Sequence, residues 1–229
     1  MKLRLKAQLT EFTGTKTFVF EAEEPIAWKA GQYIHYTLHH DNPDSRGDER
    51  WFTISSAPHE KTIKITTRIT PDAGSSFKKA LQALTPGQEI EGEEPEGKFV
   101  IDDSSQDAVF VAGGIGITPF YSILKQLDHE NKDINAELLY ANRSKDDIPY
   151  HNELEALSKK HKNFKITYFT GDNKIDEKSL KAFGDKSKDP IYYISGPEPM
   201  VEALKTTLEH MGINENHSKF DYFPGYEAE

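Results

Sequence analysis

Hydrophobic and polar side chains alternate with a period of two along the first hundred residues. The alternation recurs in short runs rich in threonine, isoleucine, valine, phenylalanine and tyrosine, and turn residues separate the runs. A helix pattern interrupts them at about 76–84 and ends before Pro86 and Gly87. Several short strands at this spacing predict an antiparallel β-barrel or sandwich. The expected strands are 2–12, 15–23, 32–40, 51–58, 61–70, 87–92 and 97–101.

The rest of the chain alternates buried strand patterns with amphipathic helix patterns. This order predicts βαβ units, and hence a parallel sheet that helices cover on both faces. The acidic stretch 101–107 separates the two patterns, so two domains are predicted, 1–102 and 103–229. The expected strands are 107–114, 136–142, 164–170 and 190–196, and the expected helices are 119–130, 151–161, 177–183 and 199–211.

Composition narrows the classes of function. The 229 residues are 36% hydrophobic and 29% charged, as in an ordinary globular protein. Cysteine is absent from the sequence, which excludes disulfides, thiol nucleophiles and cysteine-ligated zinc or iron–sulfur clusters. Redox chemistry would therefore need a bound organic cofactor or a metal site without thiolates.

Charge and hydropathy narrow them further. The net charge of −10 disfavours nucleic acid or an anionic membrane as the partner. No stretch approaches the ~20 apolar residues that span a bilayer. The N-terminus alternates like a strand and lacks the apolar core of a secretion signal, so a cytoplasmic protein without membrane insertion is expected. His35 and His39 share a strand face near Asp41 and Asp44, but solvated histidines at strand ends are far commoner than metal sites, so no metal is expected.

The strongest chemical signal is the sequence VAGGIGITPF. A predicted strand ends there at Gly113 and Gly114, and the chain turns through Gly116. A helix is expected to follow, with Thr118 as its N-cap and Pro119 as its first residue. Glycine lets a ligand approach the backbone closely, and the N–H groups at a helix start attract phosphate. A tight turn that binds nothing is the open alternative.

A second turn of the same kind is ISGPEPM, in which Gly196 and Pro197 follow the last predicted strand. Ligands of open α/β sheets bind at the carboxyl edge of the parallel strands, where this turn lies. A plain loop that happens to contain two prolines remains the alternative.

Two segments of the first half could also bind a phosphate-bearing ligand. Arg50 and Phe52 share a strand face in ERWFTISSAP, so a guanidinium and an aromatic ring lie side by side. Gly74 and Ser75 lead into a helix that opens at Ser76, which is a second anion-binding helix start. Each segment alone is equally consistent with an ordinary barrel strand or a capped helix.

Together and in this order, these segments resemble the ferredoxin–NADP reductase family over essentially the whole chain. That family has an antiparallel barrel that binds FAD, followed by a Rossmann-like α/β domain that binds the nicotinamide dinucleotide. Its flavin motif Arg-x-Tyr-Ser/Thr is matched by Arg50-Trp51-Phe52-Thr53, with phenylalanine in place of tyrosine. The resemblance implies that Arg50 binds the pyrophosphate, that Phe52 stacks on the flavin and that Thr53 lies near its reactive N5 edge.

The remaining family motifs follow in the same order. The pyrophosphate loop resembles Gly74-Ser75-Ser76, and the nucleotide turn resembles residues 113–119. The Cys-Gly-Pro-x-x-Met motif, whose cysteine lies near the nicotinamide, is matched by residues 195–200 with serine at its first position. The resemblance thus makes Thr53 and Ser195 the catalytic candidates. Its cofactor-binding candidates are Arg50, Phe52, Thr53, Thr67, Gly74, Ser75, Ser76, Gly114, Gly116, Ile117, Thr118, Arg143, Gly196, Pro197, Met200, Phe223 and Tyr226.

The loop after the second parallel strand bears on the nucleotide preference. Arg143 lies where the resemblance places a group that meets the 2′-phosphate of NADP, and Lys145 could assist it. Asp146 and Asp147 lie close by, and a carboxylate favours NAD by binding a free ribose hydroxyl. NADPH is favoured over NADH, and FAD is favoured over FMN, although the arginine and serine anchors alone do not prove an adenine pocket.

The terminal sequence KFDYFPGYEAE contains Phe223 and Tyr226. The resemblance implies that a terminal aromatic side chain covers the flavin face. Packing of the tail onto the sheet is the alternative.

The implied function is hydride transfer from NAD(P)H to bound FAD, followed by electron transfer to a separate acceptor. The acceptor could be a ferredoxin, a flavodoxin, a haem protein or a small oxidant. Two other functions stay open. One is a free-flavin reductase, for which flavin is a substrate, and the other is a nucleotide-binding or docking subunit without turnover.

Overall fold

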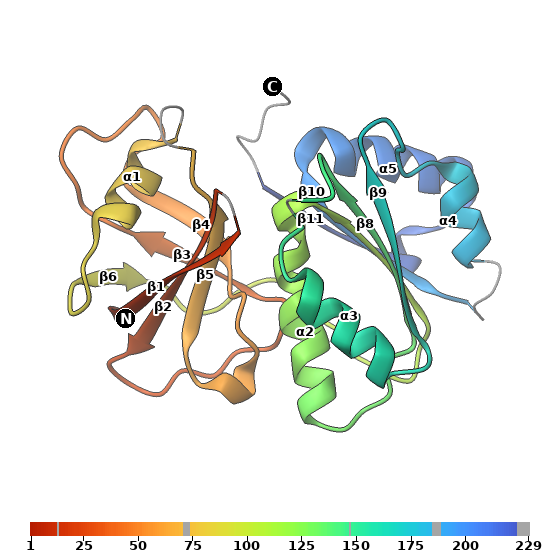
Figure 1. Cartoon of the computed structure of the whole chain (residues 1–229), viewed down its shortest axis with the longest axis horizontal. Helices are drawn as coiled ribbons and strands as arrows, with labels where there is room; N and C mark the ends of the chain where they lie inside the picture. Colours follow the sequence, from red (N-terminus) through yellow and green to blue (C-terminus); the bar gives the residue numbers. More distant parts are fainter. Residues whose placement is uncertain (13, 71–73, 147, 185–188, 224–229) are drawn as a thin grey trace.

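The computed structural model describes residues 1–12, 14–70, 74–146, 148–184 and 189–223. Two sheets, each with its own hydrophobic core, form the two halves of the molecule (Figure 1). The six-stranded antiparallel sheet comes from the N-terminal residues, and the five-stranded parallel sheet comes from the C-terminal residues. This arrangement confirms the predicted fold class.

The antiparallel sheet has the strand order β4-β3-β6-β1-β2-β5. Its core side chains alternate along the strands, as Leu3 and Leu5 of β1 and Phe18 and Phe20 of β2 show, all of them fully buried. The period-two pattern therefore predicted both the strands and their inward face. The elements are β1 (Lys2–Phe12), β2 (Thr15–Ala22), β3 (Tyr33–Thr37), β4 (Glu49–Thr53), β5 (Ile63–Arg68), β6 (Glu89–Gly92) and the helix α1 (Ser76–Ala83).

The strand expected at 97–101 does not form. Only an isolated bridge between Tyr33 and Glu96 precedes this segment. Phe99 instead leaves the barrel and packs edge-on against Phe120 and Tyr193, with ring centroids 5.3 and 5.5 Å apart. Its apolar pattern reflects burial in the core of the other half, so the segment is a connection that is anchored by one aromatic side chain.

The parallel sheet has the strand order β11-β10-β7-β8-β9. Its last strand was not predicted, because the terminal sequence mixes charged and aromatic residues without a long apolar run. The strands are β7 (Ala108–Gly113), β8 (Ala136–Asn142), β9 (Phe164–Thr170), β10 (Ile191–Pro197) and β11 (Ser218–Phe223). The helices are α2 (Thr118–His129), α3 (His151–Lys160), α4 (Glu177–Gly184) and α5 (Glu198–His210).

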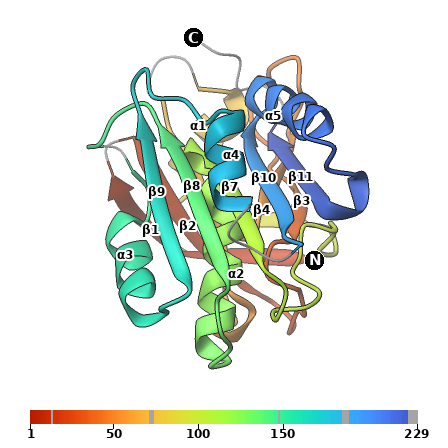
Figure 2. The ribbon, with the colours of Figure 1, turned by 90° about the vertical axis from the view of Figure 1, so that its right-hand side faces the viewer.

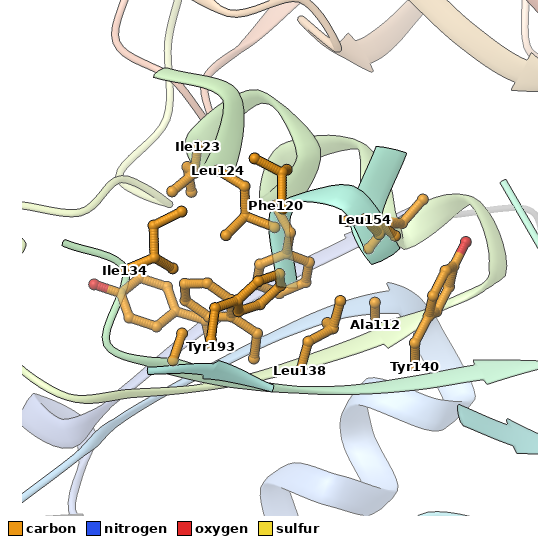
Figure 3. Packing of buried hydrophobic residues seen from close by; sticks show 14 of the residues in the cluster. Ala112, Phe120, Ile123, Leu124, Ile134, Leu138, Tyr140, Leu154 and Tyr193 are labelled. Carbon is orange, nitrogen blue, oxygen red and sulfur yellow. The ribbon is translucent and has the colours of Figure 1, made fainter. Parts of the chain in front are cut away.

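Helices cover both faces of this sheet. α2 and α3 lie on the face toward the barrel, whereas α4 and α5 cover the opposite face (Figures 1 and 2). All six residues of β7 are buried, as expected for a central strand between two helical layers. Phe120 and Leu124 of α2 pack on Leu138 and Tyr193 of the sheet (Figure 3). Within the described part of the chain, no helix combines the length and the apolar character needed to cross a bilayer.

We propose the domain division at residues 102 and 103. The antiparallel sheet ends at Gly92 and the parallel sheet begins at Ala108, so the division falls in the connecting segment.

Buried polar contacts join the two halves. The Ser122 hydroxyl of α2 donates to the Ser56 carbonyl at 2.6 Å. The Tyr150 hydroxyl, just before α3, donates to Thr66 Oγ1 of β5 at 2.6 Å, and the Tyr150 ring stacks on Tyr121 with centroids 3.8 Å apart. Tyr150 also has a left-handed backbone with φ of +61°, which costs a non-glycine residue on the order of 1 kcal/mol and persists only where other contacts hold it.

Replacement of Tyr150 tests whether this contact stabilises the protein. Tyr150→Phe keeps the ring stacked on Tyr121 and removes only the hydroxyl that bonds to Thr66. Because that bond is buried, we expect the free energy of unfolding to fall by about 1 kcal/mol in urea denaturation. Tyr168→Phe is the matched control, since its hydroxyl bonds to Glu155 at a partly exposed position, and we expect a smaller loss. An unchanged midpoint for Tyr150→Phe would contradict the stabilising role.

Candidate functional site

The two glycine-containing turns of the parallel sheet pack directly on each other. A Cβ at Gly116 would lie 2.3 Å from the Ser195 carbonyl oxygen, and one at Gly113 would lie 2.6 Å from Met200 Sδ. A Cβ at Gly196 would lie 3.2 Å from the Gly113 backbone, a less severe but still close approach. These glycines are therefore required for contact between the turns, and the structure brings the two predicted nucleotide segments together at the carboxyl edge of β7 and β10.

The helix start differs in detail from the expectation. Residues Gly114–Ile117 form a short 3₁₀ turn, and α2 begins at Thr118, so Ile117 is the N-cap. The Thr118 hydroxyl donates to the Ile115 carbonyl at 3.1 Å and does not cap the helix. The 3₁₀ turn runs directly into the helix, which leaves Thr118 inside the first turn and Pro119 at the second helical position. The Tyr140 hydroxyl donates to the Gly114 carbonyl at 2.9 Å and holds this turn in place.

Arg68 of the barrel reaches the same turn, which sequence analysis did not anticipate. A Cβ at Gly114, whose φ is +53°, would lie 3.5 Å from Arg68 Nη2. The guanidinium therefore lies against the glycine turn of the other half. Arg68 ends a strand that alternates in period two, and nothing in that local pattern distinguishes it from a surface charge.

Arg50 and Ser76, two candidates for flavin phosphate, converge on the carboxylate of Asp44. Arg50 Nη2 donates to Asp44 Oδ1 at 2.9 Å, and the Ser76 backbone N–H donates to Asp44 Oδ2 at 2.9 Å. The Arg46 N–H donates to Oδ1 as well, also at 2.9 Å. The side chains of Arg50 and Asp44 are 14% and 29% exposed, so this cluster is partly buried.

The hydrogen bonds control the charge of Asp44. Partial burial by itself would raise the pKa of Asp44, but the N–H groups of Ser76 and Arg46 and the charge of Arg50 outweigh burial and lower it to about 2. Asp44 therefore stays ionised at all ordinary pH values. A site that stabilises a carboxylate so strongly is rich in donors for an anion.

The other flavin candidates lie on both sides of this cluster. Phe52 shares the Arg50 face of β4 and packs on Phe77 of α1, with ring centroids 5.7 Å apart. Thr53 is buried at the end of β4, opposite Tyr33 of β3. Thr67 is buried on β5. Ser75 caps α1, because its hydroxyl accepts the Lys78 N–H at 3.3 Å, and Gly74 precedes it half-buried.

Ser195 pairs with a carboxyl group that sequence analysis did not single out. Its buried hydroxyl donates to Asp221 Oδ2 of the neighbouring strand β11 at 3.3 Å. Burial raises the pKa of Asp221 to about 6, although the Ser195 bond acts in the opposite direction. Burial, Glu96 and then the Asp221 charge raise the pKa of Tyr33, the cross-strand partner of Thr53. Asp221, the partner of Ser195, is therefore close enough to Tyr33 for its charge to act on the Tyr33 hydroxyl.

The remaining candidates are less informative. Arg143 and Lys145 are exposed after β8. The Phe223 side chain, Tyr226 and Asp147 lie outside the described residues. Pro197 is the N-cap of α5, and Ile117 is fully buried below the nucleotide turn.

The two histidines have other partners than the two aspartates that follow them in sequence, and they do not share a strand face, because His39 lies beyond the end of β3 at Thr37. The His35 ring stacks on Trp51 and lies 3.6 and 3.5 Å from the carboxylates of Glu49 and Glu93, whereas His39 bonds to Asp48. Over the described ranges, no three histidine, aspartate or glutamate side chains group as metal ligands.

Comparison with known proteins agrees with this geometry. Residues 110–206 match the oxidoreductase NAD-binding domain. A flavohemoprotein of Rhodopirellula baltica is 28% identical over 89% of this chain and 55% of its own length. A glycine betaine monooxygenase reductase subunit of Pseudomonas aeruginosa is 27% identical over 90% of this chain and 59% of its own length. The chain thus spans somewhat more than half the length of these relatives.

The fold extends the match over the whole chain. A ferredoxin–NADP⁺ reductase from Neisseria gonorrhoeae, solved with bound FAD and NADP, superposes with a TM-score of 0.79 over 97% of this chain and 98% of that one, at 19% identity. Barrel, parallel sheet and helical layers all have counterparts there. The resemblance found in the sequence is thereby confirmed: the chain has the two-domain fold of a ferredoxin–NADP⁺ reductase, and residues 110–206 match the oxidoreductase NAD-binding domain.

Proposed function

We propose that this chain is a flavoprotein reductase that oxidises NAD(P)H and passes the electrons to a separate acceptor. The observation that carries the proposal is the presence of two groups of hydrogen-bond donors suited to an anion. The first group consists of Arg50 and the N–H at the start of α1, in the barrel. The second consists of Arg68 and the Gly114 turn, where the barrel meets the parallel sheet. A bound flavin and a bound dinucleotide each bring phosphate groups to such positions.

The barrel residues fit a flavin phosphate. Arg50 and the Ser76 N–H already hold the carboxylate of Asp44, which stands in for an anion at that place. Phe52 lies on the same face of β4 and would offer an aromatic surface to the ring system. FAD is favoured over FMN on the family resemblance.

The nucleotide residues would come from both halves. The N-terminal turn of α2 and Arg68 would hold the pyrophosphate of NAD(P)H, and Gly196 and Pro197 would border the nicotinamide. Ser195 and Asp221 would position that ring next to the Thr53 edge of β4. Arg143 would meet the 2′-phosphate of NADP.

Bound flavin supplies the redox chemistry, because it accepts a hydride from the nicotinamide and releases electrons to an acceptor. The chain itself orients the two ring systems and keeps water away between Thr53 and Ser195, which are both buried. The relatives are a flavohemoprotein and an oxygenase reductase subunit by name, so we propose a haem protein or an oxygenase component as the kind of acceptor.

A free-flavin reductase is the second candidate. Asp44 favours it, since a carboxylate on the phosphate-binding groups disfavours permanent retention of flavin.

Anaerobic titration of the flavin-loaded protein tests the chemistry and the nucleotide preference together. We expect NADPH to bleach the flavin absorbance at lower concentration than NADH, because Arg143 would attract the 2′-phosphate. Arg143→Ala should remove that difference, while Lys162→Ala, an exposed charge elsewhere in the same half, should keep it. Equal potency of the two nucleotides with the unchanged protein would overturn the Arg143 assignment, and an absence of bleaching would overturn the proposed function.

Removal of the barrel guanidinium tests the flavin site. Arg50→Ala should weaken FAD binding about tenfold or more, because a charge-assisted hydrogen bond to phosphate is lost. Isothermal titration against the apoprotein measures the dissociation constant. Arg4→Ala removes an exposed arginine that pairs with Glu89 and serves as the control. Undiminished affinity in Arg50→Ala would mean that Arg50 has only a structural role.

The raised pKa of Asp221 predicts a pH-dependent stability effect. The folded state holds the Asp221 proton more tightly than the unfolded chain, so this carboxyl group destabilises the fold as pH rises from about 4 through about 6. Asp221→Asn removes that effect. We expect its unfolding free energy, relative to the unchanged protein, to increase over this window by on the order of 1–3 kcal/mol and to level off above it.

Urea denaturation at several pH values measures that difference. Asp102→Asn is the control, because the hydrogen bond from Lys219 lowers the pKa of Asp102, so its difference from the unchanged protein should stay nearly constant above about pH 4. A difference between Asp221→Asn and the unchanged protein that stays constant from pH 4 to 7 would contradict the burial of a titrating carboxyl group.

A further inference from the structure

The loop between β3 and β4 inserts its own carboxylate at the start of α1. Asp44 accepts hydrogen bonds from Arg50 and from the Ser76 backbone N–H, and its own N–H donates to Ser76 Oγ at 2.9 Å. The guanidinium is turned fully toward this loop, since Arg50 Nη1 donates to the carbonyls of Arg46 and Gly47 at 2.8 and 3.1 Å. Three separate elements of the chain therefore meet at one carboxylate.

The same donors are the ones that a flavin phosphate would use under the proposed function. A phosphate at Arg50 and the Ser76 N–H would lie beside Asp44, and two anions at contact distance repel strongly in a partly buried place. The strongly lowered pKa of Asp44 keeps it charged, so protonation does not relieve the repulsion. Carboxylate and phosphate are alternative occupants of these donors.

Within its own loop Asp44 has only short-range partners, because the Arg46 N–H donates to its carboxylate at 2.9 Å and the Gly47 N–H donates to its carbonyl at 2.8 Å. The loop residues Asp41, Asn42 and Ser45 on either side of Asp44 are exposed. Two left-handed positions, Asn42 with φ of +53° and Gly47 with φ of +69°, bracket the carboxylate. The Asp44 contacts are therefore what ties the tip of the loop to α1, and a phosphate that replaced them would release the tip.

We propose that Asp44 is an internal competitor for the phosphate-binding groups of the flavin site. Flavin enters by displacing the carboxylate from Arg50 and Ser76, and the carboxylate returns when flavin leaves. Asp44 lowers the affinity for phosphate-bearing flavins and makes them exchangeable. This inference rests on the proposed function, because it assumes that the barrel site binds flavin.

Asp44→Asn tests the competition, because asparagine has nearly the same shape and can still accept the Ser76 N–H but carries no charge. We expect the apoprotein variant to bind FAD at least about tenfold more tightly than the unchanged apoprotein in isothermal titration, since the charge that repels phosphate is gone. Riboflavin has the same ring system without phosphate, so its dissociation constant should be the same for both proteins.

The control variant is Asp41→Asn, which removes an exposed charge of the same loop, and we expect FAD binding to be unchanged. Asp44→Ala is a second variant that removes the acceptor oxygens as well, and it should also bind FAD more tightly than the unchanged protein. Far-ultraviolet circular dichroism confirms that each variant is folded before titration.

The outcomes separate the two claims. If the unchanged protein binds FAD and Asp44→Asn binds it equally or more weakly, Asp44 positions Arg50 and the competition is wrong while the flavin site stands. If Asp44→Asn binds riboflavin and FAD with the same gain, the effect does not arise at the phosphate and the inference is also overturned. If no variant and no unchanged protein binds either flavin, the proposed function itself fails.

Discussion

The relative placement of the two halves depends on hydroxyl groups buried between them. Thr66 of β5 receives the Tyr150 hydroxyl, and Ser122 of α2 bonds to the backbone just after β4. Such bonds are directional, and breaking one leaves a desolvated polar group, so they select one arrangement of barrel against helices. Arg68 lies two residues beyond Thr66 on the same strand, and the same arrangement therefore brings it against the Gly114 turn.

Two carboxyl groups of the candidate site have opposite electrostatic surroundings. Asp44 is surrounded by donors, and its pKa is lowered to about 2. Asp221 is buried, which raises its pKa to about 6 although it accepts a hydrogen bond from Ser195. The barrel end therefore suits an anion such as phosphate, whereas the Ser195 end suits a ring without negative charge. This contrast fits the proposed function, in which a flavin phosphate binds at Arg50 and an uncharged ring lies beside Ser195.

Much of the fold could be predicted from local pattern, because strands buried on one face and helices between buried strands leave strong periodicities. Local periodicity gave wrong or missing elements where a side chain packs on residues far away in the sequence. Phe99 lies in a sequence with a strand pattern, but it packs on Phe120 and Tyr193 in the other half. The terminal sequence of charged and aromatic residues lacks a strand pattern, although it forms β11. Within the site, glycine turns and the Arg50 strand were visible in the sequence. Asp44, Arg68 and Asp221 were not, because only the folded chain brings them to their partners.

A crystal structure of the protein loaded with FAD is the most direct test. We expect that a flavin phosphate accepts hydrogen bonds from Arg50 and the Ser76 N–H, that Asp44 has left both donors, and that the isoalloxazine ring lies between Thr53 and Ser195. An FAD molecule bound elsewhere, or bound with the Asp44–Arg50 pair intact, would contradict this expectation.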